Sequence, residues 1–179
     1  MMVRSLGRTC AVAVLALGSP LHAQEGRTAV FAVLPFENSG SYGQDKEVYQ
    51  ALEQEIPALC ASALARHPNA RVVEQARVSQ GIQTQGLARL HRVDAATAAK
   101  LGKSLGARYV VTGSFADFYG RLRINARVVD AETGEIVKVV SNDDPKLQDR
   151  AQLDGIVQAV SEKITAAVGL PPGTERTRS

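Results

Sequence analysis

The sequence predicts a single domain of the α/β (α+β) class, in which helices pack on one mixed, mostly antiparallel sheet. Short runs rich in β-branched and aromatic residues alternate with helical patterns in the order β-α-β-α-α-β-β-β-α. Tight turns join the last three predicted strands, which favours antiparallel pairing there. Helices do not alternate with strands throughout, so we do not expect an alternating βαβ array.

The first half of the chain is predicted to begin with a buried strand over Thr28–Phe36, followed by the polar loop "ENSGSYGQ". Apolar residues at three- and four-residue spacing predict a helix over Lys46–Arg66. Pro57 lacks the N–H that would bond back one turn, so we expect a kink or a fresh helix start there. A short strand at Arg71–Glu74 and a weakly patterned helix over Arg77–Leu90 follow.

The second half begins with Asp94, a good N-cap for the small-residue helix "AATAAKLGKSL". Strands are predicted over Arg108–Phe118, Arg121–Asp130 and Glu135–Val140. A charged loop then leads to a final helix over about Leu147–Val168, which carries an apolar stripe.

The first 23 residues have the layout of a secretory signal peptide. Arg4 and Arg8 give a positive start, a short apolar run follows, and a small residue stands at Ala23. The run "CAVAVLAL" is much shorter than the roughly 20 residues that span a bilayer as a helix. We predict cleavage between Ala23 and Gln24 and a periplasmic protein, against the alternative of a buried N-terminal core helix. Cys10 follows "GRT" and lacks a Leu-small-small context, so we predict no lipidation there.

Removal of this leader leaves a chain of ordinary single-domain size. We assign residues 24–170 to the α/β domain and 171–179 to a disordered tail. The full chain has a net charge of +3, and two of its arginines lie in the leader, so the mature chain is close to neutral. Trp is absent and aromatic residues make up 4% of the chain. We therefore predict no nucleic-acid partner, and no transmembrane segment in the mature chain.

Three glycines in "KLGKSLGARYVVTGSF" could suggest a phosphate-binding loop. A dinucleotide fingerprint, however, places its glycines after a strand and before a helix, so that the helix N-terminus meets the phosphate. Here the helix comes first, and its negative end would face any phosphate. We predict Gly106 as a left-handed helix cap, Gly102 as a close contact between helix and sheet, and Gly113 as a bulge or a site of close packing.

No catalytic, metal or cofactor site is predicted, and we do not expect an enzyme. Cys60 lies on the apolar face of its helix, which predicts an inert buried thiol in place of a nucleophile paired with His67 or His91. The two histidines lack Cys, Asp or Glu at ligand spacing. "NDD" at Asn142–Asp144 resembles part of a calcium loop but lacks its glycine and bidentate glutamate, so we interpret it as a solvated turn.

The most informative surface feature lies in the strand predicted over Arg121–Asp130. Apolar residues there alternate with Arg121, Arg123, Asn125 and Arg127, so that one face of the strand is apolar and the other is basic. Two interpretations stay open. The arginines either form a solvated sheet face that discourages edge pairing, or they form a docking surface for an acidic partner or for anionic envelope material.

Four segments carry a family resemblance: "VFAVLPFENSG", "ARVVEQ", "AAKLGKSLGARYVVTGSF" and "ARVVDAETGEIV". Their order is similar to that in the CsgG-like and TolB-amino-terminal-like envelope domains, over roughly residues 29–140. That family includes the curli secretion channel, flagellar-assembly outer-membrane factors and the outer-membrane activator of penicillin-binding protein. The resemblance implies a periplasmic α/β domain that binds other proteins or assembles into rings, without catalysis.

Two departures from the family refine this expectation. The loops are too short to supply the long spanning hairpins of the curli channel, and the lipidated cysteine of many relatives is missing. We therefore expect a soluble periplasmic accessory to envelope assembly or secretion, acting alone or as a homo-oligomer on an envelope protein. A regulator that activates a cell-wall synthase is the alternative. A small-molecule or glycan-binding module, the alternative from another class, would need a concave pocket.

Overall fold

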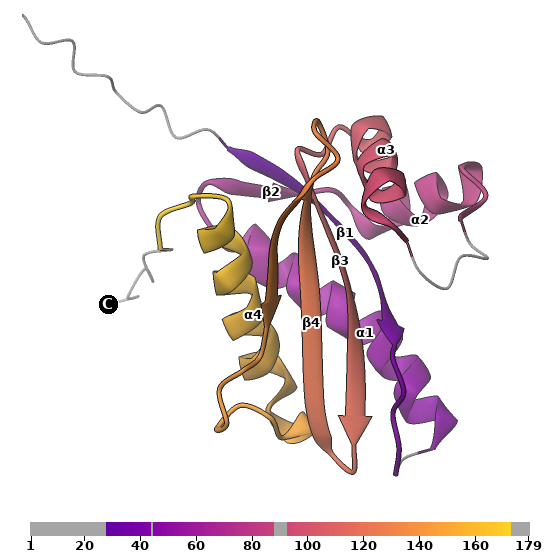
Figure 1. Ribbon diagram of the computed structural model, residues 1–179, viewed down its shortest axis with the longest axis vertical. Helices are drawn as coiled ribbons and strands as arrows, with labels where there is room; N and C mark the ends of the chain where they lie inside the picture. Colours follow the sequence, from indigo (N-terminus) through magenta and orange to yellow (C-terminus); the bar gives the residue numbers. More distant parts are fainter. Residues whose placement is uncertain (1–27, 44, 88–92, 173–179) are drawn as a thin grey trace, which may run out of the picture.

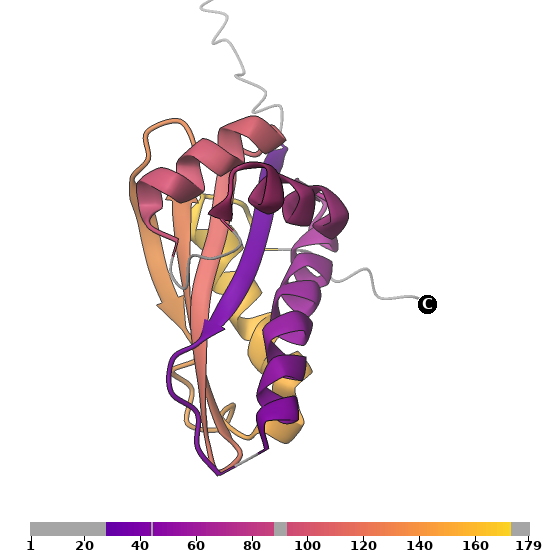
Figure 2. The ribbon, with the colours of Figure 1, turned by 90° about the vertical axis from the view of Figure 1, so that its right-hand side faces the viewer.

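The structure is a computed structural model that describes residues 28–43, 45–87 and 93–172. The predicted leader with Ala23 and Gln24, the residue His91 and the end of the predicted tail from 173 onward lie outside the described residues. A twisted sheet runs along the molecule, with helices on both of its faces (Figures 1 and 2).

The described residues form one five-stranded sheet in the order β2-β1-β3-β4-β5. Its strands are β1 (Ala29–Asn38), β2 (Ala70–Val72), β3 (Tyr109–Phe118), β4 (Arg121–Asp130) and β5 (Ile136–Ser141). β1 runs parallel to both β2 and β3, whereas β3, β4 and β5 pair antiparallel. The predicted α+β class and order of elements are confirmed, and the antiparallel pairing is confined to the second half of the chain.

Two pairs of helices cover the two faces of this sheet. α1 (Lys46–Ala65) and α4 (Leu153–Ala167) contact each other and one face. α2 (Gln75–Thr84) and α3 (Ala95–Leu105) pack on the opposite face. Figure 2 shows these two layers on either side of the sheet, with α2 and α3 gathered at one end.

Each helix layer closes its own hydrophobic core. Under α1 and α4 the core is built from large side chains, among them Phe31, Leu64, Phe115, Ile124 and Ile156. Each such side chain contributes about 1.5–3 kcal/mol when fully buried. Under α2 and α3 the core is smaller and rich in alanine and valine, and it includes Ala98, Ala99, Leu101, Val110 and Val129.

Three helices differ from the sequence-based expectation. α2 runs over Gln75–Thr84 and not over Arg77–Leu90, and Gly86, with a positive φ of 67°, follows its end. α1 continues through Pro57 without the predicted fresh start near Ile56. Both residues are buried, and that burial offsets the missing backbone hydrogen bond. The final helix begins at Leu153 and not near Leu147, because the side chain of Asp149 accepts from the backbone N–H of Ala151 and caps a short 3-10 turn first.

The glycines of residues 100–115 serve the geometry of the fold, as predicted. Gly106 adopts a left-handed conformation (φ 71°) that caps α3, and the Ala107 N–H donates to the Gly102 carbonyl at 2.9 Å. A Cβ on Gly102 would lie 2.4 Å from Cγ2 of Val110. A Cβ on Gly113 would lie 2.4 Å from the Phe36 ring and 2.5 Å from the Asn125 carbonyl oxygen.

We predict that Gly113→Ala lowers the free energy of unfolding by about 1–3 kcal/mol, because the added methyl group must displace both a buried ring and a backbone carbonyl. Urea denaturation followed by far-UV circular dichroism measures this loss. Ser114→Ala, at the next position on the opposite face of the strand, is the control and should change stability by about 0.5 kcal/mol or less. Equal stabilities of the two variants would contradict the close packing at Gly113.

Candidate functional site

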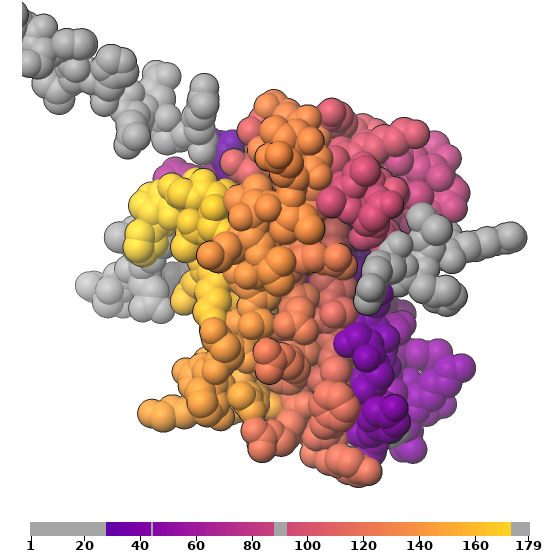
Figure 3. All heavy atoms as spheres, in the orientation of Figure 1, coloured from indigo at the N-terminus to yellow at the C-terminus, as the bar shows by residue number. Residues whose placement is uncertain are grey.

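One face of the sheet is only partly covered by helix. α3 packs on Val110 at the start of β3 and on Val129 at the end of β4. Beyond α3, both strands continue toward the β3–β4 turn with no helix over them (Figures 1 and 2). In Figure 3 the side chains of β3 and β4 reach the molecular surface in this region. We call this part without a helix, from Thr112 to Phe118 on β3 and from Arg121 to Arg127 on β4, the open face, although Thr112 and Ala116 within it are buried.

The predicted alternation along β4 is confirmed. Leu122, Ile124, Ala126 and Val128 are buried in the core under α1 and α4. Arg121 and Arg123 are exposed on the open face, and Arg127 is half-buried there. The neighbouring strand β3 places three small side chains beside this row, because Ala116 lies opposite Arg123, Ser114 opposite Asn125, and Thr112 opposite Arg127.

The three arginines differ in the hydrogen bonds and ion pairs that they form. The guanidinium of Arg121 donates to the side-chain carbonyl of Gln148 at 2.5 Å. Neither Arg123 nor Arg127 forms a hydrogen bond or an ion pair with any residue in the described part of the chain. Within the described ranges, two of the three predicted docking residues thus have a guanidinium without a hydrogen bond or ion pair.

One acidic group that interacts with this row, Asp143, already pairs with Lys163. A hydrogen bond from Lys163 is the main cause that lowers the pKa of the Asp143 carboxyl, and the positive charge of Arg123 lowers it slightly further. Lys163 also donates to the Ser141 carbonyl at 2.8 Å. Asp143 is therefore held by α4, and Arg123 acts on it only through space.

The β3–β4 turn carries a cluster of exposed aromatic side chains, which we call the aromatic tip. It consists of Tyr42, Phe118 and Tyr119, which are 63%, 46% and 80% exposed. The rings of Tyr42 and Phe118 stack with centroids 6.0 Å apart. Figures 1 and 2 place this turn at one end of the long axis of the molecule, directly after the open face.

A single buried carboxylate holds the aromatic tip in place. Asp117 is fully buried, and it accepts hydrogen bonds from the Arg150 guanidinium and from the Gly120 N–H, both at 2.7 Å. Its own backbone N–H donates to the hydroxyl of Ser41 at 2.9 Å. The Tyr119 N–H donates to the Tyr42 carbonyl at 3.0 Å. Tyr119 adopts a positive φ of 53°, an uncommon conformation that these contacts impose.

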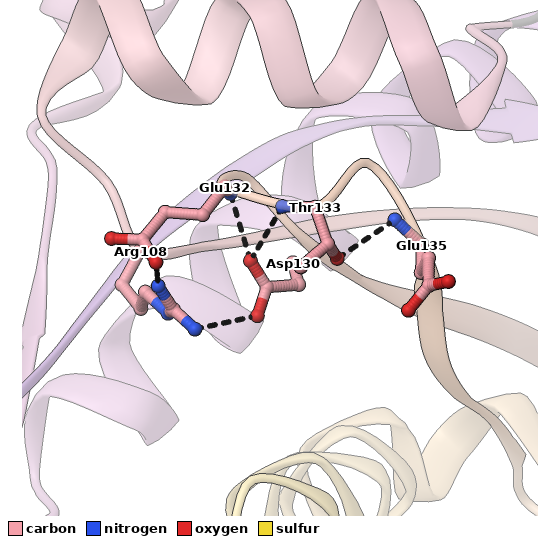
Figure 4. A network of polar contacts seen from close by, with 5 residues as sticks. All are labelled: Arg108, Asp130, Glu132, Thr133 and Glu135. Atoms are coloured by element: carbon pink, nitrogen blue, oxygen red, sulfur yellow. Dashed lines mark hydrogen bonds and ion pairs between the residues drawn. The ribbon is translucent and has the colours of Figure 1, made fainter.

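A second polar network fixes the opposite end of β4 (Figure 4). Asp130 accepts from the Arg108 guanidinium at 2.8 Å and from the backbone N–H groups of Glu132 and Thr133 at 2.7 and 3.2 Å. Arg108 also pairs with the Glu132 carboxylate, and the Thr133 hydroxyl accepts from the Glu135 N–H. These groups satisfy one another within the turn, so we assign the network a structural role.

The candidate nucleophile Cys60 is a buried thiol in this structure, as predicted. It is 1% exposed, and its sulfur lies 3.7 Å from the hydroxyl of Ser161 on α4. Burial raises the pKa of the Cys60 thiol to about 11. His67 instead contacts the Pro171 carbonyl through Nε2 at 2.7 Å and accepts from the Asn69 N–H through Nδ1. Within the described residues no group of three or more His, Cys, Asp and Glu side chains could hold a metal ion.

The interpretation of Asn142–Asp144 as a solvated turn is wrong for Asn142. This side chain is 3% exposed, accepts from the Ile124 N–H at 2.7 Å and donates to the Leu122 carbonyl at 2.8 Å. β5 has ended at Ser141, so the amide supplies hydrogen bonds that β4 would otherwise lack.

The described residues contain two notable surface hollows, and both are open to solvent. One lies between α1 and α4, beside Leu59 and Val157. The other lies next to the aromatic tip and is lined by Tyr119, Arg121 and Lys146, together with Asp149. Across those same ranges, no helix combines the length and apolar character that a membrane crossing requires.

Comparison with known proteins assigns this α+β domain to a family. Residues 18–122, more than half of the chain, match the family described as curli production assembly/transport component CsgG. The chain therefore belongs to the CsgG family. The family resemblance expected from the sequence is confirmed. A search of the curated proteins gave no match.

Solved structures resemble this chain at low sequence identity. TolB from Acinetobacter baumannii is 15% identical with a TM-score of 0.51, over 82% of this chain and 29% of that one. The LpoB C-terminal domain from Salmonella enterica is 18% identical with a TM-score of 0.48, over 64% of this chain and 81% of that one. Lipoprotein GNA1162 from Neisseria meningitidis is 20% identical with a TM-score of 0.49, over 76% and 96%. At these identities the likeness concerns the fold alone.

We predict that Cys60 does not react with Ellman's reagent at pH 8 in the native chain that starts at Gln24. With a pKa of about 11 only about a thousandth of the thiol is ionised at that pH, and the sulfur is buried. The same protein in concentrated urea, where the thiol pKa returns to about 8.5, should react at least about a hundredfold faster. Rapid reaction in the folded state would revive the nucleophile hypothesis.

We predict that Asp117→Ala lowers the free energy of unfolding by about 2–4 kcal/mol, because it leaves Arg150 and the Gly120 N–H without their partner. Urea denaturation measures the loss. Asp144→Ala is the control, since that exposed carboxylate accepts one local hydrogen bond from the Lys146 N–H, and it should cost less than about 1 kcal/mol. A stability of Asp117→Ala within error of the control would show that the buried carboxylate does not hold the tip.

Proposed function

We propose that this chain is a non-catalytic, periplasmic protein-interaction domain that serves envelope assembly or secretion and binds an acidic partner through the open face. The observation that carries the proposal is the row of arginines on β4, in which Arg123 and Arg127 have no partner among the described residues. Membership of the CsgG family supports an envelope role. The high thiol pKa of Cys60 argues against cysteine catalysis.

The geometry of the open face supports docking better than it supports simple solvation. Long, solvated, charged side chains are useful on an edge strand, where they discourage pairing with a strand of another chain. β4 is an interior strand, paired to β3 on one side and β5 on the other. Its arginines therefore protect no edge, and they cluster on one flat surface of fixed geometry.

The partner is an envelope protein under this proposal, and a cell-wall synthase that the chain activates is one version of it. Both versions use the same surface, so the identity of the captured protein separates them. The leader, the cleavage at Ala23 and Gln24, the periplasmic location and the absence of lipidation belong to the proposal as well. The mature chain acts either alone or as a homo-oligomer.

We predict that Arg123→Glu combined with Arg127→Glu reduces the yield of the captured partner about tenfold or more. The partner is captured from a cross-linked periplasmic extract of the source organism. Charge reversal replaces attraction by repulsion at the centre of the interface. The measurement compares mass-spectrometric yields on immobilised wild-type and variant chains that begin at Gln24.

The matched control is Arg71→Glu combined with Arg77→Glu, which makes the same charge change at exposed residues of β2 and α2. It should leave the capture within about twofold of the wild type. A partner captured equally well by both double variants would sink the docking role of the open face.

A further inference from the structure

The open face and the aromatic tip form one continuous surface. In the β3–β4 register Phe118 lies directly opposite Arg121, so the tip begins where the arginine row ends. Side chains on one face of a strand repeat every two residues, or about 6.8 Å. Arg121, Arg123 and Arg127 therefore lie on a straight row with this period, in which Asn125 fills the remaining position.

We propose that this surface binds an extended acidic segment of the partner protein. The segment lies along β4, places acidic side chains at alternate positions against Arg123 and Arg127, and rests an apolar side chain on the aromatic tip. The inference depends on the proposed function, since it states which kind of segment the open face takes.

The spacing of the arginines selects an extended segment over a helix. Carboxylates two or four residues apart in an extended chain repeat at the same 6.8 or about 13.6 Å as the arginines. On a helix, residues on the same face lie three or four positions apart, and the pitch is about 5.4 Å. The spacing of carboxylates on a helix therefore does not match the spacing of the arginines.

Charge places the acidic side chains on the β4 side of the surface. Arg123 and Arg127 both lie on β4 and attract carboxylates to that side. The same reasoning rules against a second copy of this chain lying face to face on the open face, because two arginine rows would oppose each other.

The β5 edge of the sheet is less suited to bind the acidic segment than the open face is. β5 is the edge strand beside β4, and its register shifts between Val128 and Val129 of β4. It also exposes Lys138. A bulge and an exposed lysine are the features that natural sheets use to discourage the addition of another strand.

The aromatic tip supplies an anchor whose position is already fixed. Tyrosine and arginine are the residues most enriched among those that dominate binding energy. Asp117 ties the tip to Arg150 and to the Ser41 loop before any partner binds, so little ordering cost remains. The row on β4, from Arg121 to Arg127, then sets a segment of about seven residues.

Fluorescence anisotropy with synthetic probes tests the inference. The first probe is a labelled peptide of about eight residues that alternates Glu with Thr and ends in Leu; the second has the same composition with its Glu residues consecutive. We expect the mature chain, Gln24 to Ser179, to bind the alternating peptide about fivefold or more tighter. Equal affinity for the two peptides, or no binding of either at about 1 mM, would overturn the inference.

Variants assign the contacts. Arg123→Glu with Arg127→Glu should weaken binding of the alternating peptide about tenfold or more, and Phe118→Ala with Tyr42→Ala about threefold or more. Arg71→Glu with Arg77→Glu should stay within about twofold of the wild type. Circular dichroism checks that each variant is folded. Unchanged affinity in the arginine variant overturns the inference, and unchanged affinity in the aromatic variant overturns its anchor.

Two further outcomes separate this inference from the proposed function. Tight, arginine-dependent binding of dextran sulfate without peptide binding would point to an anionic polymer and would overturn the inference. Arginine-dependent capture from the periplasmic extract without peptide binding would leave the proposed function standing, with a folded acidic surface as the partner. If neither the capture from the extract nor the peptide binding depends on the arginines, the inference and the proposed function are both overturned.

Discussion

The close approach around Gly113 in β3 is the constraint on which the rest of the structure depends. β3 is the strand that joins the parallel and antiparallel halves of the described sheet, because it pairs with β1 on one side and β4 on the other. The Phe36 ring and the Asn125 carbonyl occupy the space that a side chain would need at Gly113. The register of β1 shifts at the same point, between Val33 and Phe36. The two halves meet closely only because this position has no Cβ.

Element lengths then explain why one face is closed and the other open. The three long strands have 10 residues each and extend about 33 Å, and α1, with 20 residues, is about 30 Å long. α3 has 11 residues and covers only about 16 Å. One face is thus covered along its whole length, while the other is covered over about half. The basic row of β4 falls in the uncovered half, so the short helix creates the candidate site.

The sequence predicted those features that depend on local pattern. The order of elements and the alternation along β4 follow from the periodicity of apolar residues and from the turn residues. The cap at Gly106 follows from the left-handed φ that glycine adopts easily, and all three predictions are confirmed. Features that depend on tertiary contacts were not predicted: Asn142 serves as a backbone partner for β4, and Asp117 binds Arg150 across 33 residues of sequence. The aromatic tip was missed for the same reason, since Tyr42 and Phe118 meet only when the loop after β1 folds against the β3–β4 turn. Aromatics that flank a tight turn, as in "FYGR", were the available signal.

The charge distribution limits how a partner can find this surface. The mature chain is predicted to be nearly neutral, so its field at a distance is weak and long-range steering contributes little. Arg123 and Arg127 act within a Debye length of about 8 Å at physiological ionic strength. Under the proposed function, recognition therefore takes place at contact, where the spacing of the row and the position of the tip discriminate between partners. Such a surface suits a partner that is already concentrated in the same compartment, as the proposed envelope location would provide.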